Sequence, residues 1–218
     1  MAQTGVQLGR SRLRVVQSVI VLLAGIVLAF AVARLLHDVP HLVNGTMPTD
    51  EIHREYVAHP WLAYLHIAPA IVYLIGAPVQ LAYRIRSRHY SLHRRLGRVL
   101  LSCALIGGVF AIVFGVLHPY GGPGEASASV VFGLWFLVCL VSAFRAIRRD
   151  DVVRHRRWMI RAFAVGIGVG TIRIWVYVFT AAGWLDFPDA FAVAFWLAFA
   201  LHAAFAEWWI RTTPQPPG

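Results

Sequence analysis

Long runs of apolar residues dominate the pattern of this chain. Six of them are close to or longer than the roughly 20 residues that a helix needs to cross a bilayer core of about 30 Å. They cover residues 15–36, 61–83, 96–117, 127–144, 158–182 and 190–210. No run sustains the alternation of apolar and polar residues that is typical of a membrane strand. The pattern therefore predicts an all-α integral membrane protein, a bundle of six transmembrane helices.

The composition supports this prediction. Of the 218 residues, 59% are hydrophobic and 14% are charged, and the mean hydropathy is +0.65. A soluble domain usually has about 25% charged residues, so a water-soluble enzyme and a disordered protein are excluded. We expect a single membrane domain over residues 15–210, between an Arg-rich N-terminal segment (1–14) and a Pro-rich tail (211–218).

The charges are distributed unevenly between the two sides of the predicted membrane domain. All twenty basic residues are arginine, and seventeen of them fall on the side of the N-terminus. Seven of the ten acidic residues fall on the other side. The positive-inside rule then places both termini in the cytoplasm and predicts a multi-pass protein of the cytoplasmic membrane. These arginines also suit anionic lipid headgroups, and nucleic-acid binding is not indicated because they lie between apolar spans.

The first span has a second interpretation. An Arg-rich start, an apolar stretch and small residues just before Arg34 imitate a secretory signal peptide. The apolar stretch is longer than the roughly 7–15 residues of a signal core. An uncleaved first helix is therefore favoured.

Two of the predicted hairpins look alike. Each has an inner loop of about a dozen residues that ends in a His-Arg-Arg triplet, with a further arginine one turn into the next span. These residues are His93, Arg94, Arg95 and Arg98 in one hairpin and His155, Arg156, Arg157 and Arg161 in the other. The match predicts a duplicated helical hairpin, as in membrane folds that place a site between repeats.

These strings, with several shorter motifs, resemble a bacterial family of predicted membrane proteins known as domain of unknown function 2306. The resemblance covers about residues 60–211. It rests on His66, Leu74-Ile-Gly76-Ala-Pro78-Val-Gln80, both His-Arg-Arg strings, Gly121-Gly122-Pro123, Arg173 and Ala206-Glu207-Trp208. The family pattern implies a small polar residue near His202, so this histidine departs from it. The resemblance implies a fold, a topology and a place in a bacterial cytoplasmic membrane. The name of the family implies no activity.

Two ionisable residues within the spans are candidates for a functional site. A charged side chain inside a span costs about 2.5–3.5 kcal/mol on insertion scales. Arg173 and His66 are expected about 12 Å and 9 Å from the end opposite the termini, at 1.5 Å per residue. Arg173 could hold a haem propionate, a quinone oxygen or a lipid phosphate beside His66. Alternatively, it could donate to carbonyls freed near Pro69 or Pro78, or extend its side chain outward to the membrane surface.

Five histidines lie in or beside the spans: His66, His93, His118, His155 and His202. A neutral imidazole is the usual axial ligand of b-type haem. The candidate pairs are His66 with His118, His93 with His155, and His202 with either inner histidine, and His66 and His155 are the preferred metal ligands. A redox protein that uses haem b or quinone is the first hypothesis. The alternatives are a transporter or binding protein for a small anionic or lipidic solute, and an assembly factor for a membrane partner.

Arginines at the start of two spans form candidate sites for anions or lipid headgroups. The first turn of a helix offers unpaired N–H groups, and arginine binds phosphate and carboxylate with paired donors. The residues are Arg94, Arg95, Arg98, Arg156, Arg157 and Arg161. We expect Glu207 to form a structural ion pair with Arg98 or Arg161.

The loop over residues 37–60 is rich in imidazoles and carboxylates. It carries His37, Asp38, His41, Asp50, Glu51, His53, Glu55 and His59. Such side chains suit zinc or copper. No tight ligand spacing appears, however, and Pro40 is expected to interrupt a helical pairing of His37 with His41. A solvated acidic loop is the preferred interpretation.

Glycines in the fifth span have a simpler role than a nucleotide site. Gly166, Gly168 and Gly170 follow no predicted strand. We expect them to permit the close approach of neighbouring helices in the membrane.

Overall fold

The computed structural model describes residues 2–81, 85 and 88–213 of the chain. Two of the predicted loop arginines, Arg84 and Arg86, and the end of the tail, residues 214–218, lie outside this part. Within it, every regular element is a helix. The elements are α1 (Ala2–Asn44), α2 (Glu51–Ala58), α3 (Pro60–Leu81), α5 (Tyr90–Leu117), α6 (Gly122–Ile147), α7 (Val152–Ala181) and α8 (Phe187–Thr212).

Six of these helices are long and apolar enough to cross a membrane, which confirms the predicted all-α, six-span architecture. Most of them extend beyond the predicted spans. For example, α5 begins at Tyr90 and α6 at Gly122, whereas the apolar runs begin at residues 96 and 127. Hydropathy detects only the part of a helix that suits hydrocarbon, while its backbone hydrogen bonds continue into the polar flanks.

The segment between the first two spans is more helical than the sequence predicts. α1 runs through Pro40, so the expectation that this proline interrupts the helix is wrong. Proline lacks only its own N–H donor and disturbs the carbonyl four residues earlier, and the helix resumes beyond it. The rings of His37 and His41 consequently lie one turn apart, with centroids 5.2 Å from each other.

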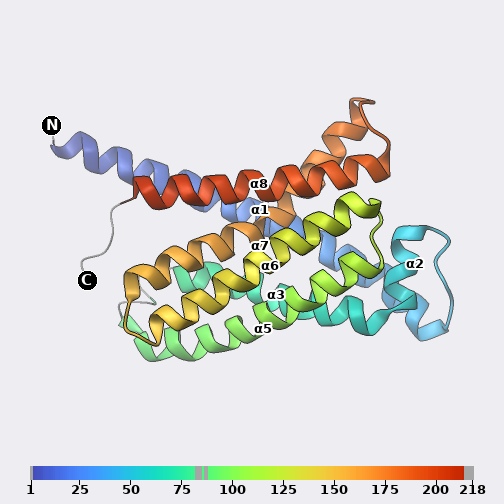
Figure 1. Cartoon of the computed structure of the whole chain (residues 1–218), viewed down its shortest axis with the longest axis horizontal. Helices are drawn as coiled ribbons and strands as arrows, with labels where there is room; N and C mark the ends of the chain where they lie inside the picture. The colour runs from blue at the N-terminus through green and yellow to red at the C-terminus, as the bar shows by residue number, and fades with distance from the viewer. Residues whose placement is uncertain (1, 82–84, 86–87, 214–218) are drawn as a thin grey trace.

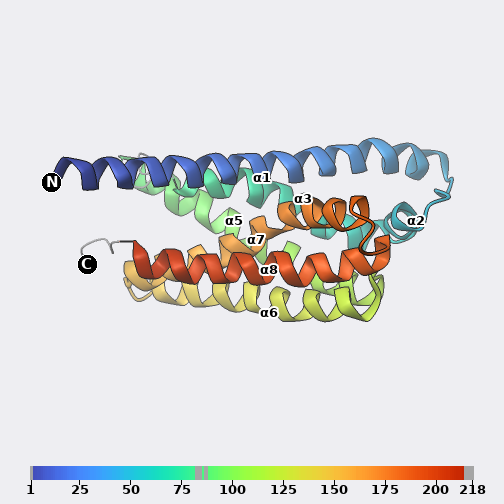
Figure 2. The same cartoon turned by 90° about the horizontal axis from the view of Figure 1, so that it is seen from above.

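The long helices form an elongated bundle (Figure 1). α3 packs along α5, α5 along α6, and α6 along α7, while α8 covers α6 and α7, and α1 lies against α7 and α3. Both described ends of the chain lie at one end of the bundle and α2 at the other (Figure 2). We call these the terminal end and the distal end.

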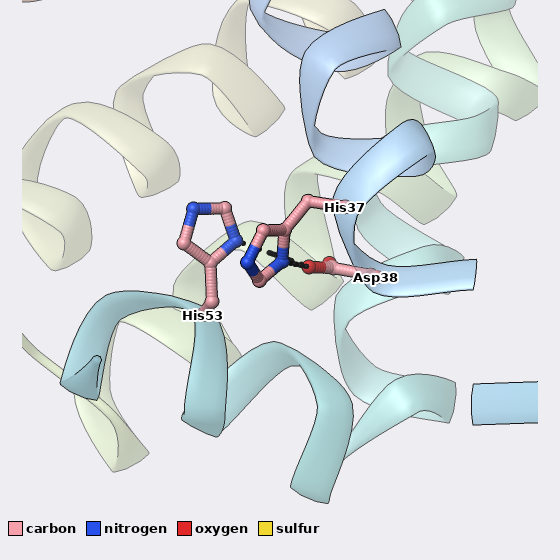
Figure 3. Close-up of side chains that lie close together, drawn as sticks. All are labelled: His37, Asp38 and His53. Atoms are coloured by element: carbon pink, nitrogen blue, oxygen red, sulfur yellow. Dashed lines mark hydrogen bonds and ion pairs between the residues drawn. The ribbon is translucent and has the colours of Figure 1, made fainter. Parts of the chain in front are cut away.

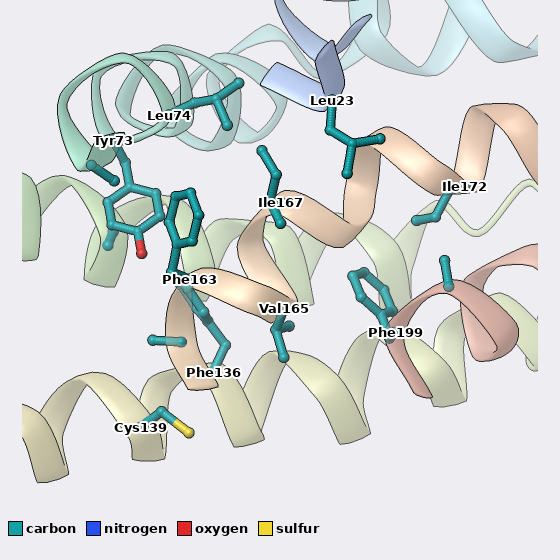
Figure 4. Close-up of a cluster of buried hydrophobic side chains, with 14 of the residues drawn as sticks. Leu23, Tyr73, Leu74, Phe136, Cys139, Phe163, Val165, Ile167, Ile172 and Phe199 are labelled. Carbon is teal, nitrogen blue, oxygen red and sulfur yellow. The ribbon is translucent and has the colours of Figure 1, made fainter. Parts of the chain in front are cut away.

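A cluster of buried apolar side chains joins the helices (Figure 4). α7 contributes more of it than its neighbours and is the most enclosed of the spans. Large apolar side chains on the outer faces, such as Trp61 and Val21, are exposed in the isolated chain. Hydrocarbon would cover these faces in a membrane. The labelled core residues are Leu23, Tyr73, Leu74, Phe136, Cys139, Phe163, Val165, Ile167, Ile172 and Phe199.

Three glycines let α7 approach three different neighbours, as the sequence predicts. A Cβ on Gly166 would lie 3.3 Å from Tyr73 of α3, and one on Gly168 would lie 3.3 Å from Phe199 of α8. A Cβ on Gly170 would lie 3.0 Å from the carbonyl oxygen of Leu23 in α1. The contact at Gly170 is with a backbone atom, which cannot move away by bond rotation as a side-chain atom can.

We predict that Gly170→Val weakens the attachment of α1. Overpacking a close helix contact typically costs about 1–3 kcal/mol, so the free energy of unfolding in detergent should fall by this amount. Gly25→Val in α1 is the matched control, because a Cβ on Gly25 meets nothing within 4 Å. Equal effects of the two substitutions in denaturant unfolding would contradict the close contact at Gly170.

Candidate functional site: a polar cluster at the distal end

His66 of α3 is within electrostatic range of Arg173 of α7. No hydrogen bond joins their side chains in the described part of the chain, so their meeting in the bundle interior stays a prediction. Nδ1 of His66 lies 2.9 Å from the carbonyl oxygen of Gly107 in α5. A carbonyl oxygen only accepts, so this bond requires a proton on Nδ1. It ties α3 to α5 within the membrane.

The Arg173 guanidinium lies between aromatic rings and other charged groups. Its Cζ is 5.4 Å from the ring centroid of Phe30 in α1 and 5.8 Å from that of Phe191 in α8. It also interacts electrostatically with Tyr56, Arg34 and Glu125. In the described part of the chain it donates no hydrogen bond to carbonyls near Pro69 or Pro78, or to any other acceptor.

Glu125 is a buried carboxylate that the sequence analysis missed. It lies in the first turn of α6 and is only 7% exposed. The backbone N–H of Gly121 donates to its Oε2 at 2.7 Å. The turn folds against α8 so tightly that a Cβ on Gly121 would lie 2.9 Å from the backbone nitrogen of Ala192. This backbone contact, invisible in the sequence, buries the carboxylate.

Asp38 is the centre of a second group of polar side chains, contributed by α1, α2 and α3. Its carboxylate is fully buried. Nδ1 of His37 and Nδ1 of His53 each lie 3.1 Å from its Oδ1 (Figure 3), and Tyr64 O–H donates to its Oδ2 at 3.1 Å. The sequence predicts a solvated loop here, but around Asp38 the side chains form a packed cluster.

Arg34 balances the charge of Asp38. Its Nη1 lies 4.0 Å from Asp38 Oδ2, one helical turn away, and 3.0 Å from Nδ1 of His53. The His53 nitrogen can therefore donate to Asp38 when it carries a proton or accept from Arg34 when it does not, but it cannot do both.

Tyr56 of α2 connects the Arg34 and Arg173 regions. Its ring packs against the Arg34 guanidinium, whose Cζ lies 3.8 Å from the ring centroid. The ring centroids of Tyr56 and Phe114 are 4.6 Å apart. Burial raises the pKa of its hydroxyl above the usual value, although Arg34 and Arg173 act in the opposite direction. The phenol therefore stays neutral between two guanidinium groups.

The outer histidine pair that the sequence offers for haem, His66 with His118, is not brought together. Nδ1 of His118 lies 2.6 Å from Glu55 Oε2 at the distal end. His66 is bonded to Gly107, eleven residues earlier in α5, which is about 16 Å along a helix. Two ligands separated in this way cannot bind one iron.

The inner histidines are also spread along the bundle. The ring of His202 lies against Gly168 of α7, whereas His155 Nδ1 lies 2.9 Å from the carbonyl oxygen of Ala143 in α6. Gly168 follows His155 by thirteen residues, which is about 20 Å along α7. The pair of His202 with His155 is therefore not formed. His93 and His155 occupy the same position, the fourth residue, of α5 and α7.

The predicted arginine sites at the terminal end are partly satisfied by the protein itself. Arg161 and Glu207 form the ion pair, with Nη2 donating to Oε2 at 2.9 Å, so Arg161 rather than Arg98 is the partner. Nη2 of Arg156 lies 3.4 Å from Thr213 Oγ1, and Asp151 caps the start of α7 by accepting from Arg154 N–H at 2.8 Å.

The side chains of the other predicted arginines are exposed: Arg94, Arg95, Arg98 and Arg157. Lipid binding there stays a prediction, as does the duplication of the hairpin.

Comparison with known proteins identifies the family. The family model described as "Predicted membrane protein (DUF2306)" matches residues 63–210. No curated protein and no solved structure matches the chain. The match includes His66, Glu125 and Arg173, whereas α1 and α2 precede it. The chain is a multi-pass membrane protein that belongs to the DUF2306 family of predicted membrane proteins.

Proposed function

We propose that the protein binds an anionic or strongly polar amphiphile, whose oxygen-rich head is held by Arg173 at the distal end. The observation that carries this proposal is the unsatisfied guanidinium. The guanidinium of an arginine has five N–H donors. Arg173 is half-buried, and no acceptor among the described residues takes a hydrogen bond from it. An incoming phosphate, carboxylate or quinone oxygen would supply one.

The surrounding charges favour an external acceptor over an internal one. Glu125, the carboxylate that acts electrostatically on Arg173, already accepts from the backbone N–H of Gly121. Asp38, the other buried carboxylate of the distal end, is engaged by histidines and Tyr64. Arg34 adds a second positive charge within electrostatic reach of Arg173. Guanidinium binds phosphate and carboxylate with two parallel, charge-assisted bonds, which suits an anionic head.

The helix arrangement favours entry from the membrane. α1 and α8 both pack against α7, and within the described helices their backbones do not approach each other. Arg173 lies between Phe30 of α1 and Phe191 of α8, and Phe30 is 52% exposed. The positive-inside rule places the distal end on the outer side, so the amphiphile would enter from the outer leaflet. A phospholipid and a quinone share the required chemistry, a polar oxygen head on an apolar tail.

The test is a titration of purified protein in detergent with phosphatidylglycerol and, separately, with a short-chain ubiquinone, followed by thermal stabilisation. We expect Arg173→Ala to require about tenfold more amphiphile to reach half of the maximal increase in Tm, because one charged hydrogen bond contributes about 1.5–3 kcal/mol. Arg54→Ala, which removes an exposed arginine from α2, should titrate like the wild type.

The two probes distinguish the two sources of the head group. A loss confined to phosphatidylglycerol identifies an anionic lipid, and a loss confined to ubiquinone identifies a quinone. Arg173→Lys keeps the charge without the paired donors and should give an intermediate effect, which also guards against misfolding of the alanine variant. If Arg173→Ala and the wild type respond alike to both probes, the proposal is wrong.

A haem-binding redox role is the second candidate, and we assign it to the inner pair, His93 with His155. The bond from His155 Nδ1 to Ala143 fixes the proton on that nitrogen and leaves Nε2 for a metal, a pattern common in metal-bound histidines. Protein purified from haem-replete cells should then show a Soret band that disappears in His155→Ala and persists in His202→Ala. A colourless, folded preparation would reject this candidate.

A further inference from the structure

The distal end holds a second, separate group of ligating side chains, Glu55, His59 and His118. Glu55 and His59 lie one helical turn apart, at the end of α2, and His118 immediately follows α5. Glu55 Oε2 lies 2.6 Å from His118 Nδ1 and 3.7 Å from His59 Nε2. The two imidazole rings stack with centroids 4.2 Å apart. All three ligand atoms lie within 4.8 Å of one another.

We propose that Glu55, His59 and His118 form a binding site for a divalent transition metal of the zinc or copper class. Two imidazole nitrogens and one carboxylate oxygen are a common ligand set for these metals. Bonds of about 2.0–2.2 Å in a tetrahedral arrangement place neighbouring ligand atoms somewhat more than 3 Å apart. The observed separations of 2.6 Å and 3.7 Å lie on either side of this value.

The site is open to the aqueous phase. The side chains of Glu55 and His59 are 42% and 44% exposed, whereas His118 is 16% exposed and packs against Phe114. A metal ion can therefore enter from solution and keep water in its fourth position. Three protein ligands with an open position are typical of exchangeable or catalytic zinc rather than of closed structural sites.

The neighbouring group of His37, Asp38 and His53 has similar spacing but a different charge environment. Its ligand atoms also lie within 4.8 Å of one another. Nη1 of Arg34, however, lies 3.0 Å from Nδ1 of His53, and Asp38 is fully buried (Figure 3). A guanidinium already occupies the space beside these ligands, and its positive charge opposes a second cation. The two groups lie on different faces of α2, so each serves as a control for the other.

The experiment is a calorimetric titration of the detergent-purified full chain with Zn²⁺ at pH 7.5. We expect one zinc ion per chain. Loss of a group that merely orients a ligand costs about 10–100-fold in metal affinity, so His118→Ala and His59→Ala should each weaken binding at least tenfold. Glu55→Gln should act in the same direction. His37→Ala should leave the affinity unchanged.

A second measurement separates a ligand role from a structural one. Co²⁺ in a four-coordinate site gives visible absorption bands, which should appear with the wild type and His37→Ala and be absent with His118→Ala. Helical content by circular dichroism should be the same in all variants. The proposal is overturned if the wild type binds no Zn²⁺ at 1:1 stoichiometry, or if His37→Ala rather than His118→Ala removes binding.

Discussion

The close approach of neighbouring helices to α7 is the contact on which the rest of the bundle depends. Between helices in lipid the hydrophobic effect gives little driving force, so van der Waals contact and polar bonds decide which faces meet. Gly166, Gly168 and Gly170 remove side chains on three faces and admit α3, α8 and α1. Arg173 follows one turn after Gly170 and is thereby placed between α1 and α8.

Backbone carbonyls accept the hydrogen bonds of two histidines in the spans, whereas the buried hydroxyl of Tyr73 has no partner among the described residues. His66 bonds to the Gly107 carbonyl across α3 and α5, and His155 bonds to the Ala143 carbonyl across α6 and α7. Both bonds join the two helices of a hairpin. Interhelical hydrogen bonds in membrane proteins average only about 0.6 kcal/mol, so they specify which faces meet more than they stabilise the fold. Arg173 differs because it has no such acceptor in the described part of the chain, and this difference makes it the centre of the proposed binding site.

The short helix α2 organises the chemistry of the distal end. Asp50 caps it by accepting from His53 N–H at 2.9 Å. Its two faces then present His53 to α1 and Glu55 to the end of α5, with Tyr56 packed between Arg34 and Phe114. About two turns of helix thus contribute to a charge-balanced buried cluster and to an open ligand set.

The sequence by itself determined the six spans, the uneven distribution of arginine and the family. These properties follow from length, hydropathy and charge along the chain, which the thickness and polarity of a bilayer constrain directly. The depths of His66 and Arg173 could also be predicted, since each residue advances a helix by a constant rise, and the two residues are within electrostatic range of each other. Which side chains meet at a given depth was decided by tertiary structure alone. Helix rotation and backbone contacts paired His118 with Glu55 instead of His66, selected Arg161 for Glu207 and buried Glu125, because a one-dimensional pattern specifies how far along a helix a residue lies but not which neighbour its face will meet.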